Sequence, residues 1–192
     1  MMCELKPVVL VDSREKRPLV IRAFPVEVVT LGTGDYGVRG FSGPENPAFV
    51  LERKSVDDLA GSLGRERARF WRECERMRGF RFRGILIEGT QEQVRQHAYR
   101  SEIAPQSILG SLDALAVRCN IHVFWCGSPD GAARQLESLV RQFARGIQKD
   151  FVRLRDACET PPQPATLTIG GQTSYAPATD PDGQTLDPAR ET

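Results

Sequence analysis

Short runs of β-branched residues alternate with amphipathic stretches along the first 155 residues, and this alternation constrains the fold more than any other feature. Strand-like runs come first, and helix-like and strand-like segments then alternate. The runs expected as strands are 7–12, 26–30, 33–38, 49–54, 84–88 and 121–125, and the stretches expected as helices are 65–78, 105–118 and 130–155. This order predicts an α/β fold, a mixed sheet flanked by helices.

The end of the chain has a different composition from the rest. From residue 158 onward it is rich in Pro, Gly, Thr and Asp, and it carries too few apolar residues to offset the entropy lost on folding. We therefore predict one folded domain over residues 1–157 and a disordered tail over residues 158–192.

The composition excludes some classes of protein. No apolar run approaches the ~20 residues that span a bilayer, and the N-terminus lacks a secretory signal pattern, so no membrane partner is expected. The five cysteines show no CxxC spacing, which favours reduced thiols in an intracellular protein, in the cytoplasm or nucleoid if the source is bacterial or phage. A net charge of +1 neither indicates nor excludes a nucleic-acid partner.

The segments TGDYGV and FVLERK flank a turn-rich stretch and are expected to form a hairpin. If the hairpin turns at Gly43 and Pro44, paired residue numbers sum to 87, and Asp35 then lies directly opposite Glu52. Strand side chains alternate between faces, so Lys54 shares their face. Two opposed carboxylates need a cation or a proton between them, and hard oxygen ligands suit Mg²⁺ or Mn²⁺. The pattern predicts a metal site.

The alternative is that these charges simply decorate the solvated face of an edge hairpin. Three features favour a metal site instead. Asp12 ends the first strand and is followed closely by Glu15, glycines flank Asp35, and the acidic run SVDD follows Lys54 at once.

These residues lie in motifs that resemble those of the XPF-type structure-specific endonucleases, whose nuclease domain carries VDxRE and GDx(n)ERKx(3)D. Here the motifs are VDSRE at 11–15, GDY at 34–36 and ERKSVDD at 52–58, and the similarity covers roughly residues 8–150. The resemblance implies a restriction-endonuclease-like sheet and Mg²⁺- or Mn²⁺-dependent hydrolysis of phosphodiester bonds in branched DNA, such as flaps, forks or junctions, in repair, recombination or replication.

The resemblance also implies roles for individual residues. Asp35 and Glu52 would bind the metal, Lys54 would orient or help to ionise the attacking water, and Arg53 would contact phosphate or brace the site. From position alone, Asp12 and Glu15 are expected to take part directly or nearly so, with Asp12 a further candidate metal ligand.

Two other acidic residues are open to more than one interpretation. Asp58 occupies the last motif position, but it is also the final residue of an S-x-x-D capping box, so catalysis and helix capping both remain open. Glu88 ends a strand, and whether it approaches the same edge also stays open.

Arginines are the candidate DNA contacts. On the helix expected at 65–78 they recur at helical spacing on the side away from Phe70 and Met77, either as a stripe that contacts phosphate or as an ordinary solvated face in an arginine-rich chain. The predicted DNA-binding residues are Arg14, Arg65, Arg69, Arg72 and Arg76.

The last expected helix has a wide apolar stripe that its own sheet or a second subunit must cover. Because members of the resembled family pair through this region, we predict a homodimer. The larger relatives carry helix-hairpin-helix modules and some a helicase region, and neither is expected here, so a partner protein could supply substrate selection. The competing interpretation is a non-catalytic DNA-binding or scaffold subunit of the same fold, and the intact acidic residues argue against it.

Overall fold

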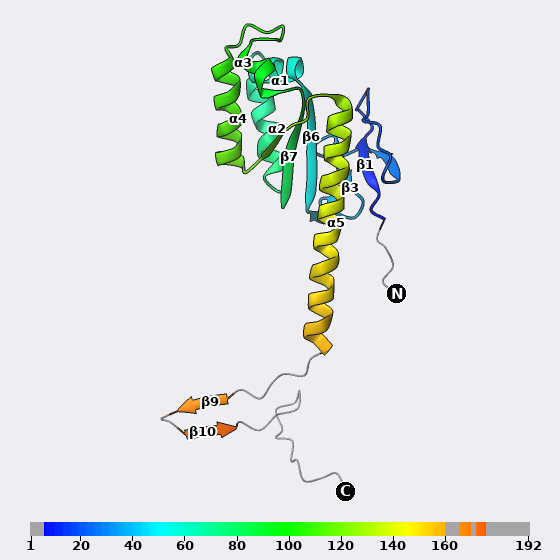
Figure 1. The fold of residues 1–192 in the computed structure, drawn as a ribbon, viewed down its shortest axis with the longest axis vertical. Helices are drawn as coiled ribbons and strands as arrows, with labels where there is room; N and C mark the ends of the chain where they lie inside the picture. The colour runs from blue at the N-terminus through cyan, green and yellow to red at the C-terminus, as the bar shows by residue number, and fades with distance from the viewer. Residues whose placement is uncertain (1–5, 160–165, 170–171, 176–192) are drawn as a thin grey trace. The chain divides into compact units, whose positions relative to one another are not determined.

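A computed structural model of the chain describes residues 6–159, 166–169 and 172–175 (Figure 1). The chain divides into two compact units, residues 1–148 and residues 149–192. The elements are β1 (Val9–Asp12), β2 (Val26–Val29), β3 (Tyr36–Val38), β4 (Ser42–Gly43), β5 (Asn46–Pro47), β6 (Phe49–Ser55), α1 (Val56–Leu63), α2 (Arg67–Met77), β7 (Phe82–Glu88), α3 (Gln91–Arg95), α4 (Pro105–Cys119), β8 (His122–Trp125), α5 (Pro129–Glu159), β9 (Thr166–Ile169) and β10 (Gln172–Tyr175).

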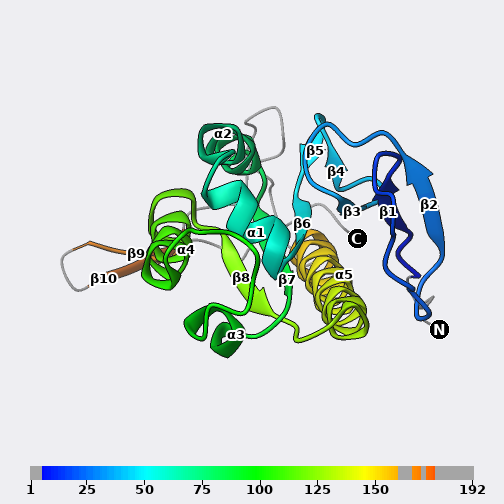
Figure 2. The same cartoon turned by 90° about the horizontal axis from the view of Figure 1, so that it is seen from above.

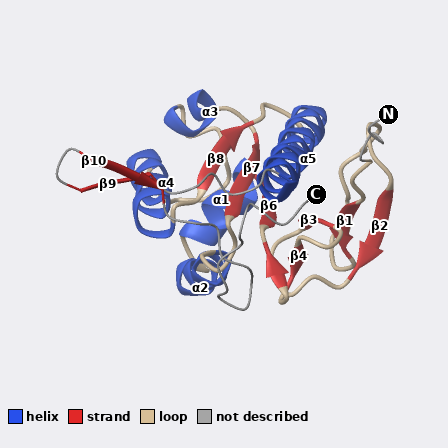
Figure 3. Ribbon diagram, turned by 90° about the horizontal axis from the view of Figure 1, so that it is seen from below, coloured by secondary structure: helices blue, strands red, loops and turns tan. Residues whose placement is uncertain are grey.

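Within the described residues of the first unit, six strands form a mixed sheet in the order β2-β1-β3-β6-β7-β8. The pairs β1–β2, β6–β7 and β7–β8 are parallel, and β3 runs antiparallel to both β1 and β6. The sheet packs α1, α2 and α4 against one face and α5 against the other (Figures 2 and 3). The predicted mixed α/β sheet flanked by helices is confirmed.

The two faces of the sheet hold two separate apolar cores. On one face, Ile85 and Ile87 of β7 pack with Phe70 of α2 and Ile108 of α4. On the other face, the fully buried Leu86 packs with residues of α5. Strand alternation thus divides neighbouring residues of β7 between the two cores.

Local signals explain where several helices begin and end. The Ser55 hydroxyl accepts from the Asp58 N–H and caps α1, and Thr90 with Gln93 forms a capping box at α3. Pro105 occupies the first turn of α4, and Asn120 ends it in the left-handed conformation. The short helix α3 was not foreseen, because five residues are too few for a helical period to be recognised.

Of the cysteines, Cys74 and Cys119 are buried, whereas Cys126 is half-buried and Cys158 is exposed. Burial raises the pKa of the Cys74 thiol to about 12, so this group stays protonated and unreactive at neutral pH. Cys3 lies outside the described residues.

The predicted disordered tail, residues 158–192, lies mostly outside the described residues. Within the described part of the tail, β9 and β10 pair in antiparallel fashion. No helix in the described part of the chain is both long and apolar enough to cross a bilayer.

Candidate active site

The site begins with the pairing of β3 and β6. Tyr36 pairs with Leu51, and the Asp35 N–H donates to the Leu51 carbonyl across 2.9 Å. These residue numbers sum to 87, so the predicted register is confirmed, and Asp35 is set beside Glu52. Gly34, at a φ of +74°, permits this approach, because a Cβ there would lie 2.9 Å from the Leu51 carbonyl oxygen.

The turn of the hairpin lies one residue later than predicted. Gly43 pairs with Asn46, so the turn is at Pro44 and Glu45. Arg39 and Gly40 form a separate turn with Gly40 at a φ of +80°, and these two extra residues shift the hairpin turn without changing the pairing of Tyr36 with Leu51.

Two carboxylates in this hairpin are poorly solvated. Burial and the nearby charge of Glu52 raise the pKa of Asp35 to about 7. Burial likewise raises the pKa of Glu52, whose residue is only 8% exposed. The Asp35 carboxylate accepts from the backbone N–H of Arg53 at 2.8 Å, which stabilises its charge only in part. The pair therefore holds more negative charge than its surroundings neutralise.

Lys54 reaches into the same region. Its Nζ atom lies 2.5 Å from Oε1 of Glu52 and 5.4 Å from the centroid of the Phe70 ring on α2. Burial lowers the pKa of Lys54, but the charges of Glu52 and Asp35 outweigh burial and raise it. The ammonium group is a fixed positive charge beside the two carboxylates.

These side chains line an open cavity of about 590 Å³. Nine of the predicted site residues meet there: Asp12, Arg14, Glu15, Asp35, Glu52, Lys54, Asp58, Arg69 and Arg76. Three others, Arg53, Arg65 and Arg72, do not line it. The prediction missed Lys16 and Glu73, which also do. Glu73 follows Arg69 by four residues and precedes Arg76 by three on α2, and this helical spacing could have revealed it.

Asp12 is held by its neighbours. Its carboxylate accepts from the Arg14 N–H at 2.8 Å, from Nε and Nη2 of Arg14 at 2.7 and 2.9 Å, and from the Leu31 N–H at 2.7 Å. The Arg14 hydrogen bond lowers the pKa of Asp12. Asp12 therefore fixes the loop after β1 and presents the guanidinium of Arg14 at the cavity.

Arg53 points away from the cavity and joins three segments. Its Nε donates to Oε1 of Glu88 at 2.6 Å, its Nη1 donates to the Arg17 carbonyl at 2.5 Å, and it forms an ion pair with Glu15 at 3.4 Å. Of the two roles that the sequence allowed, this geometry supports the brace. Glu88 lies at this edge of the sheet, opposite Ser55 of β6, where it accepts from Arg53 and does not line the cavity.

Asp58 lies in the first turn of α1, which Ser55 caps, and it also lines the cavity. Its N–H donates to Ser55 Oγ at 3.0 Å, and Ser55 Oγ donates to its carboxylate at 2.7 Å, so its carboxylate supports the cap through the Ser55 hydroxyl. A catalytic role for Asp58 stays a prediction.

The four arginines of the predicted stripe are all exposed, but their positions differ. Arg69 and Arg76 line the cavity from α2, whereas Arg72 does not, and Arg65 precedes the helix. The helix predicted at 65–78 is confirmed as α2, which begins two residues later than predicted, at Arg67.

A divalent cation would find oxygen ligands at Asp35 and Glu52. Among the described side chains, no group of three or more His, Cys, Asp or Glu residues could hold a metal ion as it stands. The oxygens of Asp12 accept from Arg14 and from the Leu31 N–H in this arrangement, and its role as a further metal ligand stays a prediction. The carboxylates of half-buried Asp35 and buried Glu52, with raised pKa values and hard oxygen atoms, fit Mg²⁺ or Mn²⁺.

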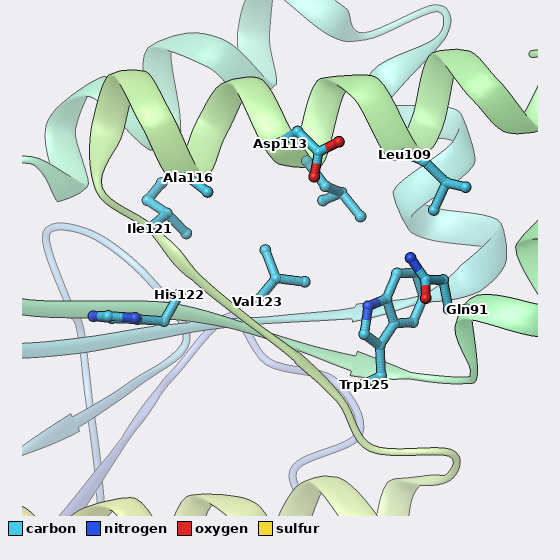
Figure 4. A pocket seen from close by; sticks show the side chains of 9 residues that line it. Gln91, Leu109, Asp113, Ala116, Ile121, His122, Val123 and Trp125 are labelled. Carbon is cyan, nitrogen blue, oxygen red and sulfur yellow. The ribbon is translucent and has the colours of Figure 1, made fainter.

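A second hollow, of about 270 Å³, lies between α4 and β8 and differs in chemistry. Leu109 and Asp113 face it from α4, and Val123 and Trp125 from β8 (Figure 4). Its lining combines apolar side chains with Gln91, His122 and a single carboxylate, that of Asp113, so it lacks the paired carboxylates of the first cavity.

The six-stranded sheet, its flanking helices and the carboxylate–lysine cavity at the end of β6 define a nuclease-type α/β domain. The chain belongs to the ERCC4 domain family, whose sequence model matches residues 11–139, and it is an XPF-type nuclease domain.

The similarity extends to full-length proteins and to solved structures. The chain is 32% identical over 145 residues to the DNA repair endonuclease XPF of Cricetulus griseus, and 32% identical over 142 residues to that of Mus musculus. These alignments cover 70% and 68% of this chain but only 15% and 14% of the relatives.

Two solved structures share the fold. The structure of XPF from Aeropyrum pernix matches with a TM-score of 0.57 and 25% identity, covering 74% of this chain and 68% of that one. The same protein in complex with DNA matches with a TM-score of 0.56 and 24% identity, covering 73% and 66%.

Proposed function

We propose that this chain is a divalent-metal-dependent endonuclease that hydrolyses phosphodiester bonds in branched DNA, such as flaps, forks or junctions. The observation that carries the proposal is the carboxylate pair of half-buried Asp35 and buried Glu52, beside the Lys54 ammonium in an open cavity rimmed by arginines. Membership of the ERCC4 domain family supports it.

The proposed role of each residue follows from its position in the site. Lys54, held by Glu52 and the Phe70 ring, places positive charge where charge develops on the scissile phosphate. Arg69 and Arg76 at the rim suit the flanking phosphates of the bound strand. Arg53 keeps the loop that carries Glu15 in place.

Asp35 and Glu52 would hold Mg²⁺ or Mn²⁺. When bound, such an ion supplies positive charge to the scissile phosphate and lowers the pKa of water. It would also offset the charge of two carboxylates whose pKa values are raised by desolvation.

A substrate panel tests this function. Flap, fork, junction and linear DNA would be incubated with Mg²⁺ or Mn²⁺, using the unmodified protein, Asp35→Asn and Lys54→Met. We expect cut products from a branched substrate and a loss of at least ~100-fold in rate in each variant. Asp113→Asn is a matched control, because this exposed aspartate lies on α4 outside the site, and it should cut like the unmodified protein.

The panel also addresses the alternative, a non-catalytic DNA-binding or scaffold subunit. Cleavage that Asp35→Asn leaves unchanged would point to a contaminating nuclease and would contradict the proposal. Binding of branched DNA without any cleavage, with either metal, would favour the scaffold.

We also propose that the chain forms a homodimer. Leu136 and Val140, in the first half of α5, are covered by the chain's own sheet, whereas Phe151 and Leu154 are 66% and 65% exposed. A second copy could cover them. Light scattering at micromolar concentration should give twice the chain mass, and a monomer mass would contradict the proposal. The chain spans about 15% of the length of the curated relatives it matches, and a partner protein that supplies substrate selection is part of the proposal.

A further inference from the structure

The solvent face of α5 carries a second set of arginines. Arg134, Arg141 and Arg145 are spaced by seven and four residues, which places them on one face of the helix. All three are exposed, while Leu136 and Val140 on the opposite side are fully buried against the sheet.

The charge of these arginines is not balanced by neighbouring carboxylates. Within the described part of the chain, none of the three forms an ion pair. Asp130 lies one helical turn before Arg134 on the same side of α5, and within the described residues it forms no ion pair. Glu137, on the flank of this face, accepts from the backbone N–H groups of Arg22 and Ala23 at 2.6 and 2.9 Å. It therefore holds the 22–24 loop on α5, and Phe24 of this loop lies under Arg141, with the guanidinium 5.6 Å from the ring centroid.

This arginine face is separated from the candidate active site by the sheet. The cavity is lined from α2, and α2 packs on one face of the sheet while α5 packs on the other (Figure 2). The protein thus presents basic side chains in two directions.

The dimensions suit a nucleic-acid backbone. Eleven residues of helix separate Arg134 from Arg145, which is about 16 Å at 1.5 Å per residue. Duplex DNA carries one negative charge per ~1.7 Å of its axis, so a duplex along α5 offers phosphates to all three arginines.

We propose that the Arg134–Arg141–Arg145 face of α5 binds the phosphate backbone of a second duplex arm of a branched DNA whose first arm lies against α2. Duplex DNA is stiff, with a persistence length of ~150 base pairs, so a short linear duplex does not reach helices on opposite faces of one domain. A branched molecule sends arms in different directions and reaches both. This inference rests on the proposed function and names the feature of the substrate that the domain recognises.

The test measures binding without cleavage. Fluorescence anisotropy in EDTA would compare a fork with two duplex arms and a linear duplex of equal length, across a range of salt concentrations. In the triple variant Arg134→Ala, Arg141→Ala, Arg145→Ala, the slope of log Kd against log salt for the fork should fall by about 2–3, near 0.9 per lost phosphate contact. Affinity for the fork should drop at least tenfold, and the linear duplex should bind as before.

A second triple variant controls for overall charge. Arg39→Ala, Arg95→Ala, Arg118→Ala removes the same charge from exposed arginines on β3–β4, α3 and α4. It should change the affinity for the fork by less than threefold. Both variants alter exposed side chains, so their melting temperatures should stay close to that of the unmodified protein.

The outcomes separate this inference from the function on which it rests. An unmodified protein that bound none of the DNAs would overturn the proposed function itself. If that protein bound the fork, but the α5 variant kept the full salt slope or lost fork and linear binding equally, the assignment of α5 to a second arm would be wrong.

Discussion

The Nε atom of Arg53 donates to Oε1 of Glu88 across 2.6 Å, and this bond joins β6 to the end of β7. Both side chains are largely buried, 13% and 7% exposed. In sequence, Arg53 lies between Glu52 and Lys54, two residues of the candidate site. Its side chain instead braces the sheet and the loop after β1.

Breaking this brace should destabilise the fold. We expect Arg53→Met or Glu88→Gln alone to lower the free energy of unfolding by about 3 kcal/mol, because each removes the shorter ion pair of a largely buried charge. In a double-mutant cycle followed by urea unfolding, the pair should show a coupling energy of at least ~1.5 kcal/mol. The exposed pair Arg78–Glu75, at 2.9 Å, is a matched control and should show a much smaller coupling energy, because solvent screens it. Equal coupling in the two pairs would show that Arg53 is not a brace.

The hydrogen bonds that hold the Asp12 carboxylate should stabilise the fold at neutral pH and lose that effect in acid. Asp12→Asn should destabilise the protein by about 2 kcal/mol at pH 7, since it loses charge-assisted hydrogen bonds to Arg14 and Leu31. The pKa of Asp12 is lowered by folding, so its contribution is complete above the unfolded value of 3.8 and is lost as the pH falls through the folded pKa. Urea unfolding at pH 7 and below pH 4 measures this. A deficit that persisted unchanged in acid would contradict the assignment.

Asp35 should behave in the opposite way. Its pKa is raised from 3.8 to about 7, so ionisation costs stability as the pH rises through that window. Without divalent ions, Asp35→Asn should be more stable than the unmodified protein at pH 8.5, by roughly 1–3 kcal/mol, and the difference should shrink towards pH 4. The substitution keeps an oxygen acceptor for the Arg53 N–H.

The same pair of proteins tests metal binding without reference to catalysis. Adding Mn²⁺ at pH 8.5 should raise the melting temperature of the unmodified protein and leave Asp35→Asn unchanged, because only a ligand bound to the folded state stabilises it. An equal rise in both proteins would remove Asp35 from the metal site.

The arginines in and just before α2 should differ in their contribution to DNA binding. Arg69 and Arg76 line the cavity, whereas Arg65 and Arg72 do not. The double variant Arg69→Ala, Arg76→Ala should weaken DNA binding in EDTA about tenfold or more and lower the salt slope by about 2, while Arg65→Ala, Arg72→Ala should have a smaller effect. Equal losses would indicate a continuous stripe, as the helical spacing alone suggests.

Much of the fold and of the site could be predicted from the sequence, because the signals are local and periodic. The two-residue period of a strand placed Asp35, Glu52 and Lys54 on one face, and a single assumption about the turn set the register. The turn was misplaced by one residue, yet the pairing held, since the two residues added in the turn at Arg39 and Gly40 balance the shift.

Tertiary structure alone decided the partners of each charge. Arg53 and Glu88 are 35 residues apart, and the Leu31 N–H that helps to occupy Asp12 is 19 residues away. Glu73 enters the cavity only because α2 packs against β6 and β7. A strand's period determines which face a side chain takes, but the hydrogen bonds between Asp12 and Leu31, and between Arg53 and Glu88, depend on how distant segments pack.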